Sequence, residues 1–129
     1  MKNQTTTSKP SQSKKESALM QRVQRRLDAT LSHLGPFVRI AHDTEASVVE
    51  IGEIKDGVFS PKVRWSLHVI TRPPLASPFV AFTETDLGTN QTTKRTFGGG
   101  DKMLIVCLQS WAERLVAPHW RARYRREAA

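Results

Sequence analysis

The sequence predicts an α+β fold: an N-terminal amphipathic helix, a four- to five-stranded antiparallel sheet, and a C-terminal helix or helix pair packed on one face. Three patterns support this fold class. Apolar residues recur every three or four positions in residues 13–34, and apolar and polar residues alternate in residues 63–69. A second apolar helical pattern follows the three glycines at positions 98–100.

The 129 residues fit one domain of ordinary size. Residues 1–12 are rich in threonine, serine, lysine and glutamine, so we expect a disordered basic and polar tail followed by a single α+β domain over residues 13–129. There is one cysteine, Cys107, and therefore no internal disulfide. A lone thiol in an apolar stretch suits a reducing compartment, and we expect a cytoplasmic location.

The first helix has clear start and stop signals. Ser13 and Glu16 have the spacing of a capping box, and Gly35 and Pro36 are typical of a helix end. Between them the helical spacing places five apolar side chains in one stripe: Met20, Val23, Leu27, Leu31 and Leu34. The stripe predicts a helix that packs on the sheet. The same spacing leaves open a short dimer seam, so a homodimer is an alternative.

The middle of the chain predicts strands at residues 37–41, 47–54, 63–69, 79–85 and 92–97. Asp56-Gly57 favours a tight turn between two of them, because both residue types tolerate positive φ. Glycines 98–100 then suggest a hinge, and Asp101 is a suitable N-cap for a helix over residues 102–117. Pro118 ends that helix and can open a further short one.

The formal net charge is +8, and it is concentrated at the two ends of the chain. Residues 1–35 carry +5, residues 36–110 are neutral, and residues 111–129 carry +3. Such asymmetry is typical of proteins that meet a polyanion. We therefore expect a non-enzymatic nucleic-acid-binding accessory protein, with salt-sensitive contacts to the phosphate backbone through its basic terminal segments.

Two groups of residues are the candidates for these contacts. Arginines and lysines would neutralise phosphates, while Trp120 and Tyr124 would offer stacking platforms. The candidate residues are Lys14, Lys15, Arg22, Arg25 and Arg26 in the first helix, and Trp120, Arg121, Arg123, Tyr124, Arg125 and Arg126 near the C-terminus. DNA, RNA and an acidic protein are all compatible with this pattern.

A second hypothesis is a small protein-binding module or inhibitor, for example a mobile-element counter-defence protein, that acts on an acidic or nucleic-acid-facing surface of a partner. We expect no enzymatic activity, cofactor or metal. The imidazole of His42 lies near Asp43 and Glu45 in sequence, but polar residues are also typical of a turn between strands. No apolar run approaches the roughly 20 residues that cross a bilayer, so no membrane association is expected.

Overall fold

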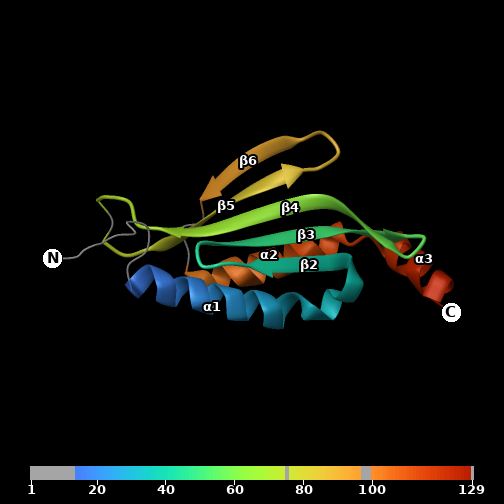
Figure 1. Cartoon of the computed structure of the whole chain (residues 1–129), viewed down its shortest axis with the longest axis horizontal. Helices are drawn as coiled ribbons and strands as arrows, with labels where there is room; N and C mark the ends of the chain where they lie inside the picture. Colours follow the sequence, from blue (N-terminus) through green and yellow to red (C-terminus); the bar gives the residue numbers. More distant parts are fainter. Residues whose placement is uncertain (1–13, 75, 97–99, 129) are drawn as a thin grey trace.

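The structure is a computed structural model that describes residues 14–74, 76–96 and 100–128. It confirms the α+β fold with an N-terminal helix, a five-stranded antiparallel sheet and two C-terminal helices (Figure 1). In chain order, the elements are α1 (Lys14–Leu31), the 3-10 helix η1 (Ser32–Phe37), β2 (Val38–His42), β3 (Ala46–Lys55), β4 (Val58–Ile70), β5 (Phe79–Asp86), β6 (Gln91–Thr96), α2 (Asp101–Leu115) and α3 (Pro118–Ala128).

The five strands form a meander in the order β2-β3-β4-β5-β6, and every neighbouring pair is antiparallel. Consecutive strands pair because short turns join most of them. Asp56 and Gly57 form the β3–β4 turn with φ angles of 52° and 77°, as the sequence predicted. β4 begins at Val58, five residues earlier than expected, because a β-bulge lets Pro61 stay in the strand without breaking the ladder.

The bulge lies where the register shifts between Ile51 and Gly52. Ile51 pairs with Val63 and Gly52 pairs with Pro61, which leaves Lys62 as the extra residue of β4. The two backbones approach so closely that a Cβ on Gly52 would lie 2.0 Å from the Ser60 carbonyl oxygen. Only glycine fits this position.

Helices α1 and α2 lie side by side and run in the same direction. Arg26 near the middle of α1 contacts Asp101 at the start of α2, and His33 just beyond α1 contacts Glu113 near the end of α2. The core forms where they meet the sheet, and several of its side chains are at most 1% exposed: Val23, Leu27, Leu31, Val49, Ile51, Trp65, Leu67, Leu104 and Leu108. The predicted apolar stripe is therefore used inside the chain's own core and is not available as a dimer seam.

Two details at the helix ends differ from the sequence-based expectations. The N-cap of α2 is Gly100, and Asp101 is the first residue of the helix, because its carboxylate turns toward the arginines of α1. The last turn expected for α1 is instead the 3-10 helix η1, in which Gly35 has a φ of 57°. The tail at residues 1–12, the capping residue Ser13 and two hinge residues, Gly98 and Gly99, lie outside the described residues.

Candidate nucleic-acid interface

The positive charge of the domain belongs to its helices. The strands and loops over residues 32–100 carry seven basic and seven acidic residues. The three helices carry five acidic residues and eleven basic ones: Lys14, Lys15, Arg22, Arg25, Arg26, Lys102, Arg114, Arg121, Arg123, Arg125 and Arg126. The strands and loops taken together are thus neutral, and the helices carry the net positive charge that attracts anions.

Three of the predicted contact residues on α1 are open to solvent. Lys14, Lys15 and Arg25 are exposed. Arg22 and Arg26 are partly committed to Asp101, with Nε to Oδ2 distances of 3.6 Å and 3.1 Å. Their side chains remain 46% and 37% exposed, so each can still reach a phosphate from the ion pair.

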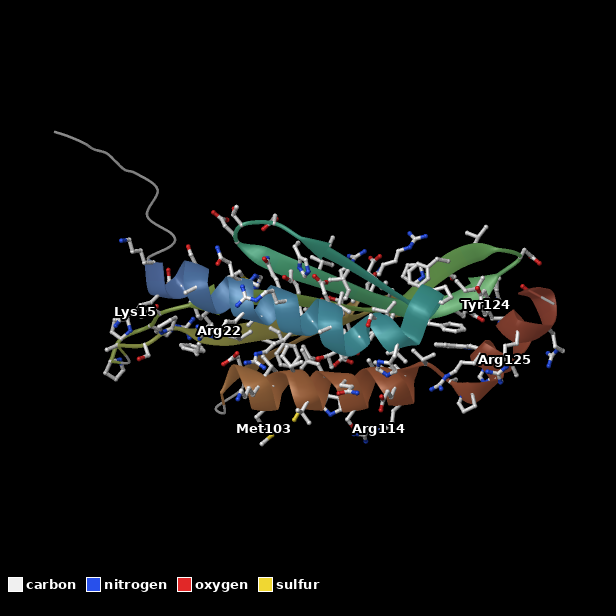
Figure 2. The ribbon with its side chains drawn as sticks, turned by 90° about the horizontal axis from the view of Figure 1, so that it is seen from below. Lys15, Arg22, Met103, Arg114, Tyr124 and Arg125 are labelled. Atoms are coloured by element: carbon white, nitrogen blue, oxygen red, sulfur yellow. The ribbon has the colours of Figure 1, made fainter. Side chains whose placement is uncertain are left out.

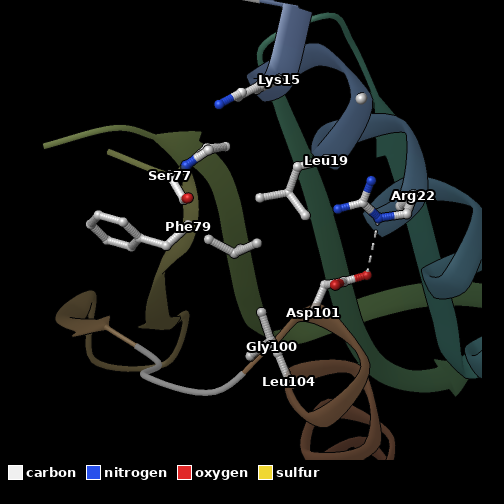
Figure 3. A pocket seen from close by; sticks show the side chains of 11 residues that line it. Lys15, Leu19, Arg22, Ser77, Phe79, Gly100, Asp101 and Leu104 are labelled. Carbon is white, nitrogen blue, oxygen red and sulfur yellow. Dashed lines mark ion pairs between the residues drawn. The ribbon is translucent and has the colours of Figure 1, made fainter. Parts of the chain in front are cut away.

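A cavity of about 370 Å³ lies at this end, between the start of α1, the start of β5 and the start of α2 (Figure 3). Its walls are largely apolar, with Leu19 and Leu104 on the helices and Phe79 on β5. Lys15 and Arg22 add positive charge, but the Asp101 carboxylate also lines the cavity. The open helix surface therefore suits a polyanion better than this cavity does.

Two of the four arginines predicted near the C-terminus have structural partners. Arg121 Nη2 donates to the carbonyl oxygens of Glu113 at 3.3 Å and Val116 at 3.2 Å, and so caps the end of α2. Arg123 donates to the carboxylate of Glu53, which is only 5% exposed. Lys62 Nζ lies 3.4 Å from the same carboxylate. We assign Arg121 and Arg123 to holding α3 on the domain.

The two predicted stacking residues also contribute to packing. The Tyr124 ring meets Phe37 edge-on, with centroids 5.5 Å apart. Trp120 packs against the core and meets His119 edge-on at 5.8 Å. Both rings are half-buried, so neither is presented as a free stacking platform. Arg125 and Arg126, in the last turn of α3, are exposed.

The two basic clusters lie on the helical side but at opposite ends of the molecule. Figure 2 shows Lys15 and Arg22 at one end and Arg125 at the other, with Arg114 of α2 between them. Lys102 and Arg114 are exposed, and the sequence analysis did not select them. Both residues lie away from the apolar stripe of α2, and this position in the helical pattern of the sequence would have identified them as exposed cations.

Met103 and Val106 also lie on the outer surface of α2, with exposed fractions of 57% and 59%. Apart from Val58 in the β3–β4 turn region, they are the large apolar residues that stand most exposed among the described residues. About one helical turn separates them. Lys102 adjoins this small apolar patch in sequence, and Arg114 lies about two helical turns beyond Val106.

The polar residues around His42 form a local structural network. His42 lies between Asp28, whose Oδ1 is 2.9 Å from Nε2, and Ser47, whose Oγ is 2.8 Å from Nδ1. The order Ser–His–Asp is that of a hydrolase triad, but Ser47 is fully buried and no substrate can reach its hydroxyl. No cluster in the described residues has the ligands for a metal ion.

Asp43 closes the β2–β3 turn. Its carboxylate accepts backbone N–H groups from Glu45 at 2.7 Å and from Ala46 at 2.8 Å. These two hydrogen bonds, the one from Glu45 first, hold the pKa of Asp43 below its ordinary value of 3.8. Asp43 thus stabilises the turn, in line with the expectation that polar residues are typical of a turn between strands.

Comparisons with known proteins add no relative. No protein-family model, curated protein or solved structure matches this chain. Within the part of the chain that the structure describes, no helix is both long enough and apolar enough to cross a membrane.

Proposed function

We propose that this protein is a non-enzymatic nucleic-acid-binding accessory protein whose helices contact the phosphate backbone. The observation that supports the proposal is the difference in net charge between the helices and the rest of the domain. The helices hold eleven basic and five acidic residues, whereas the sheet and loops are balanced. A polyanion gains most by lying against the helical side, where each neutralised phosphate releases counterions.

The contacts come from the exposed cations of all three helices. On α1 they are Lys14, Lys15 and Arg25, supported by Arg22 and Arg26. Lys102 and Arg114 continue the surface along α2, and Arg125 and Arg126 complete it on α3. Phosphate contacts carry no sequence information, so binding should be largely independent of base sequence.

Fluorescence anisotropy with a labelled 16-base-pair DNA duplex tests the proposal. About six phosphate contacts should lower the association constant roughly a thousandfold between 50 mM and 200 mM salt. Replacing Arg125 and Arg126 together by alanine should weaken binding and reduce the slope of log K against log salt by about 2.

The matched control removes two cations from outside the helices. Arg72 lies after β4 and Lys94 on β6, and both are exposed. The double variant Arg72→Ala/Lys94→Ala has the same net charge as the test variant and should bind nearly as the unaltered chain does. Equal losses in both variants, or no binding at 50 mM salt, would rule the proposal out.

The exposed pair Met103 and Val106 favours a second candidate function, an acidic protein partner. Nucleic-acid backbones gain little from apolar side chains, whereas a protein surface gains from covering them. Lys102 and Arg114 would then pair with carboxylates around the apolar contact.

Pull-down from nuclease-treated lysate separates these two functions. A protein partner should remain bound after the nucleic acid is destroyed. It should be lost from the variant Met103→Ser/Val106→Ser but kept by Arg125→Ala/Arg126→Ala. Loss of all bound protein on nuclease treatment would leave nucleic acid as the direct ligand.

A further inference from the structure

The aromatic side chains of this protein are used for packing. Eight of its nine aromatic residues lie in the described part of the chain, and seven of these belong to the core or pack against it: Phe37, Phe59, Trp65, Phe82, Trp111, Trp120 and Tyr124. The eighth, Phe79, is half-buried and lines the cavity beside β5. Single-strand binding proteins rely on exposed aromatic rings that stack on successive bases. The described surface offers no row of such rings.

Two cavities on the helical side are also poorly suited to bind single-stranded nucleic acid. The cavity at the start of the helices contains Asp101 beside Lys15 and Arg22. The cavity near α3 contains Glu113 beside Arg121 and Arg125. A channel that guides a single strand is lined by one sign of charge. Other exposed cations of the helices, among them Lys14, Arg25 and Lys102, do not line either cavity, and a broad and stiff ligand can meet them on the outer helix surface.

The length of the helices sets the scale of that ligand. α1 has 18 residues and spans about 27 Å at 1.5 Å per residue. Lys14 and Lys15 stand at its first turn, and Arg125 and Arg126 stand at the opposite end of the molecule (Figure 2). A duplex rises 3.4 Å per base pair, so about eight base pairs already lie along α1 alone. The α3 cluster lies beyond the end of α1, so a longer duplex is needed to reach both clusters.

The greater stiffness of a duplex favours it over a single strand as the ligand. A duplex of this length is effectively rigid, because its persistence length is about 150 base pairs. It can therefore reach both clusters without a loss of conformational freedom. A single strand must be ordered over the same span, and among the described residues it finds no row of exposed aromatic rings whose stacking would offset that cost.

We infer that the preferred ligand is a nucleic-acid duplex longer than about eight base pairs, laid along the helices so that it contacts the α1 and α3 clusters together. This inference rests on the proposed function and names its ligand class. It extends that function from polyanions in general to one form with a minimum length.

Anisotropy with DNA hairpins of 6, 10 and 16 base pairs tests the inference, alongside single strands of thymidine with matched numbers of phosphates. At 100 mM salt we expect affinity to rise at least tenfold from 6 to 16 base pairs, because only the longer duplex reaches both clusters. Each duplex should bind at least tenfold more tightly than its matched single strand.

The variant Arg125→Ala/Arg126→Ala removes one of the two clusters and should abolish the step between 6 and 16 base pairs. Its control, Arg72→Ala/Lys94→Ala, should keep the step. Equal affinity for duplexes and single strands, or a step that survives loss of the α3 cluster, overturns this inference while leaving the proposed function intact. Absence of binding to every probe at 50 mM salt overturns the proposed function itself.

Discussion

Arg26 of α1 donates from Nε to Oδ2 of Asp101 at the start of α2, across 3.1 Å. The same carboxylate lies 3.6 Å from Arg22. One acidic residue therefore joins the two helices and lowers the charge of the surface that we assign to nucleic acid.

Replacing Asp101 by asparagine should tighten duplex binding. The substitution frees Arg22 and Arg26, and one further phosphate contact is worth roughly tenfold in affinity at 0.1 M salt. Stability should fall by no more than about 1 kcal/mol, because the ion pair is partly exposed. Asp56→Asn, with the same charge change in the β3–β4 turn, is the control for anisotropy and should change affinity little. Weaker binding of Asp101→Asn would mean that the carboxylate positions the arginines for the ligand.

Replacing Arg123 by alanine should destabilise the domain by about 1–3 kcal/mol. Glu53 is 5% exposed, and removal of Arg123 leaves its buried carboxylate with only Lys62 and Lys55, at 3.4 Å and 4.0 Å, as partners. Urea unfolding measures the effect. Adding Glu53→Gln to Arg123→Ala should recover part of the loss, whereas Arg125→Ala should cost less than about 0.5 kcal/mol. A wild-type midpoint for Arg123→Ala would contradict the structural role given to this residue.

Gly52→Ala should destabilise the protein by more than about 3 kcal/mol or prevent folding. The added Cβ would stand 2.0 Å from the Ser60 carbonyl oxygen and 2.7 Å from the Pro61 Cα, both of them backbone atoms that cannot move aside cheaply. Gly100→Ala is the control, because nothing lies within 4 Å of its added Cβ. Thermal unfolding should separate the two variants clearly, and similar melting temperatures would show that the bulge can open.

Asp43→Ala should destabilise the β2–β3 turn at neutral pH but not in acid. The folded pKa of Asp43 is lowered by the N–H groups of Glu45 and Ala46, so its stabilisation is present above the ordinary value of 3.8. It is lost as the pH falls through the lowered folded pKa. The difference in unfolding free energy between the two proteins should therefore shrink below about pH 4. A difference that stays constant to pH 2 would mean that the ionised carboxylate is not what matters.

The fold could be predicted from sequence because its determinants are local. The stripe from Met20 to Leu31 and the alternation from Val63 to Val69 each report a face that meets the core. Asp56 and Gly57 likewise fix their own turn. The start of β4 was missed because a proline usually ends a strand, and the bulge that accommodates Pro61 depends on Gly52 of the partner strand.

The candidate interface was harder to predict because charge is redistributed by tertiary contacts. The sequence separates Arg26 from Asp101 by 75 residues and Arg123 from Glu53 by 70, so neither pair can be read from local pattern. Trp120 and Tyr124 fall at a spacing that suits stacking, but both rings pack against the core. A cation that pairs with a carboxylate elsewhere in the fold, as Arg123 does with the buried Glu53, is less available to a ligand.

The common direction of α1 and α2 has an electrical consequence. Peptide dipoles in parallel helices add, so both positive ends lie near Lys14 and Asp101 and both negative ends lie toward α3. Arg121 of α3 complements the C-terminus of α2, because it donates directly to the carbonyl groups of Glu113 and Val116. Part of the C-terminal charge thus serves the protein's own backbone, with or without a polyanion.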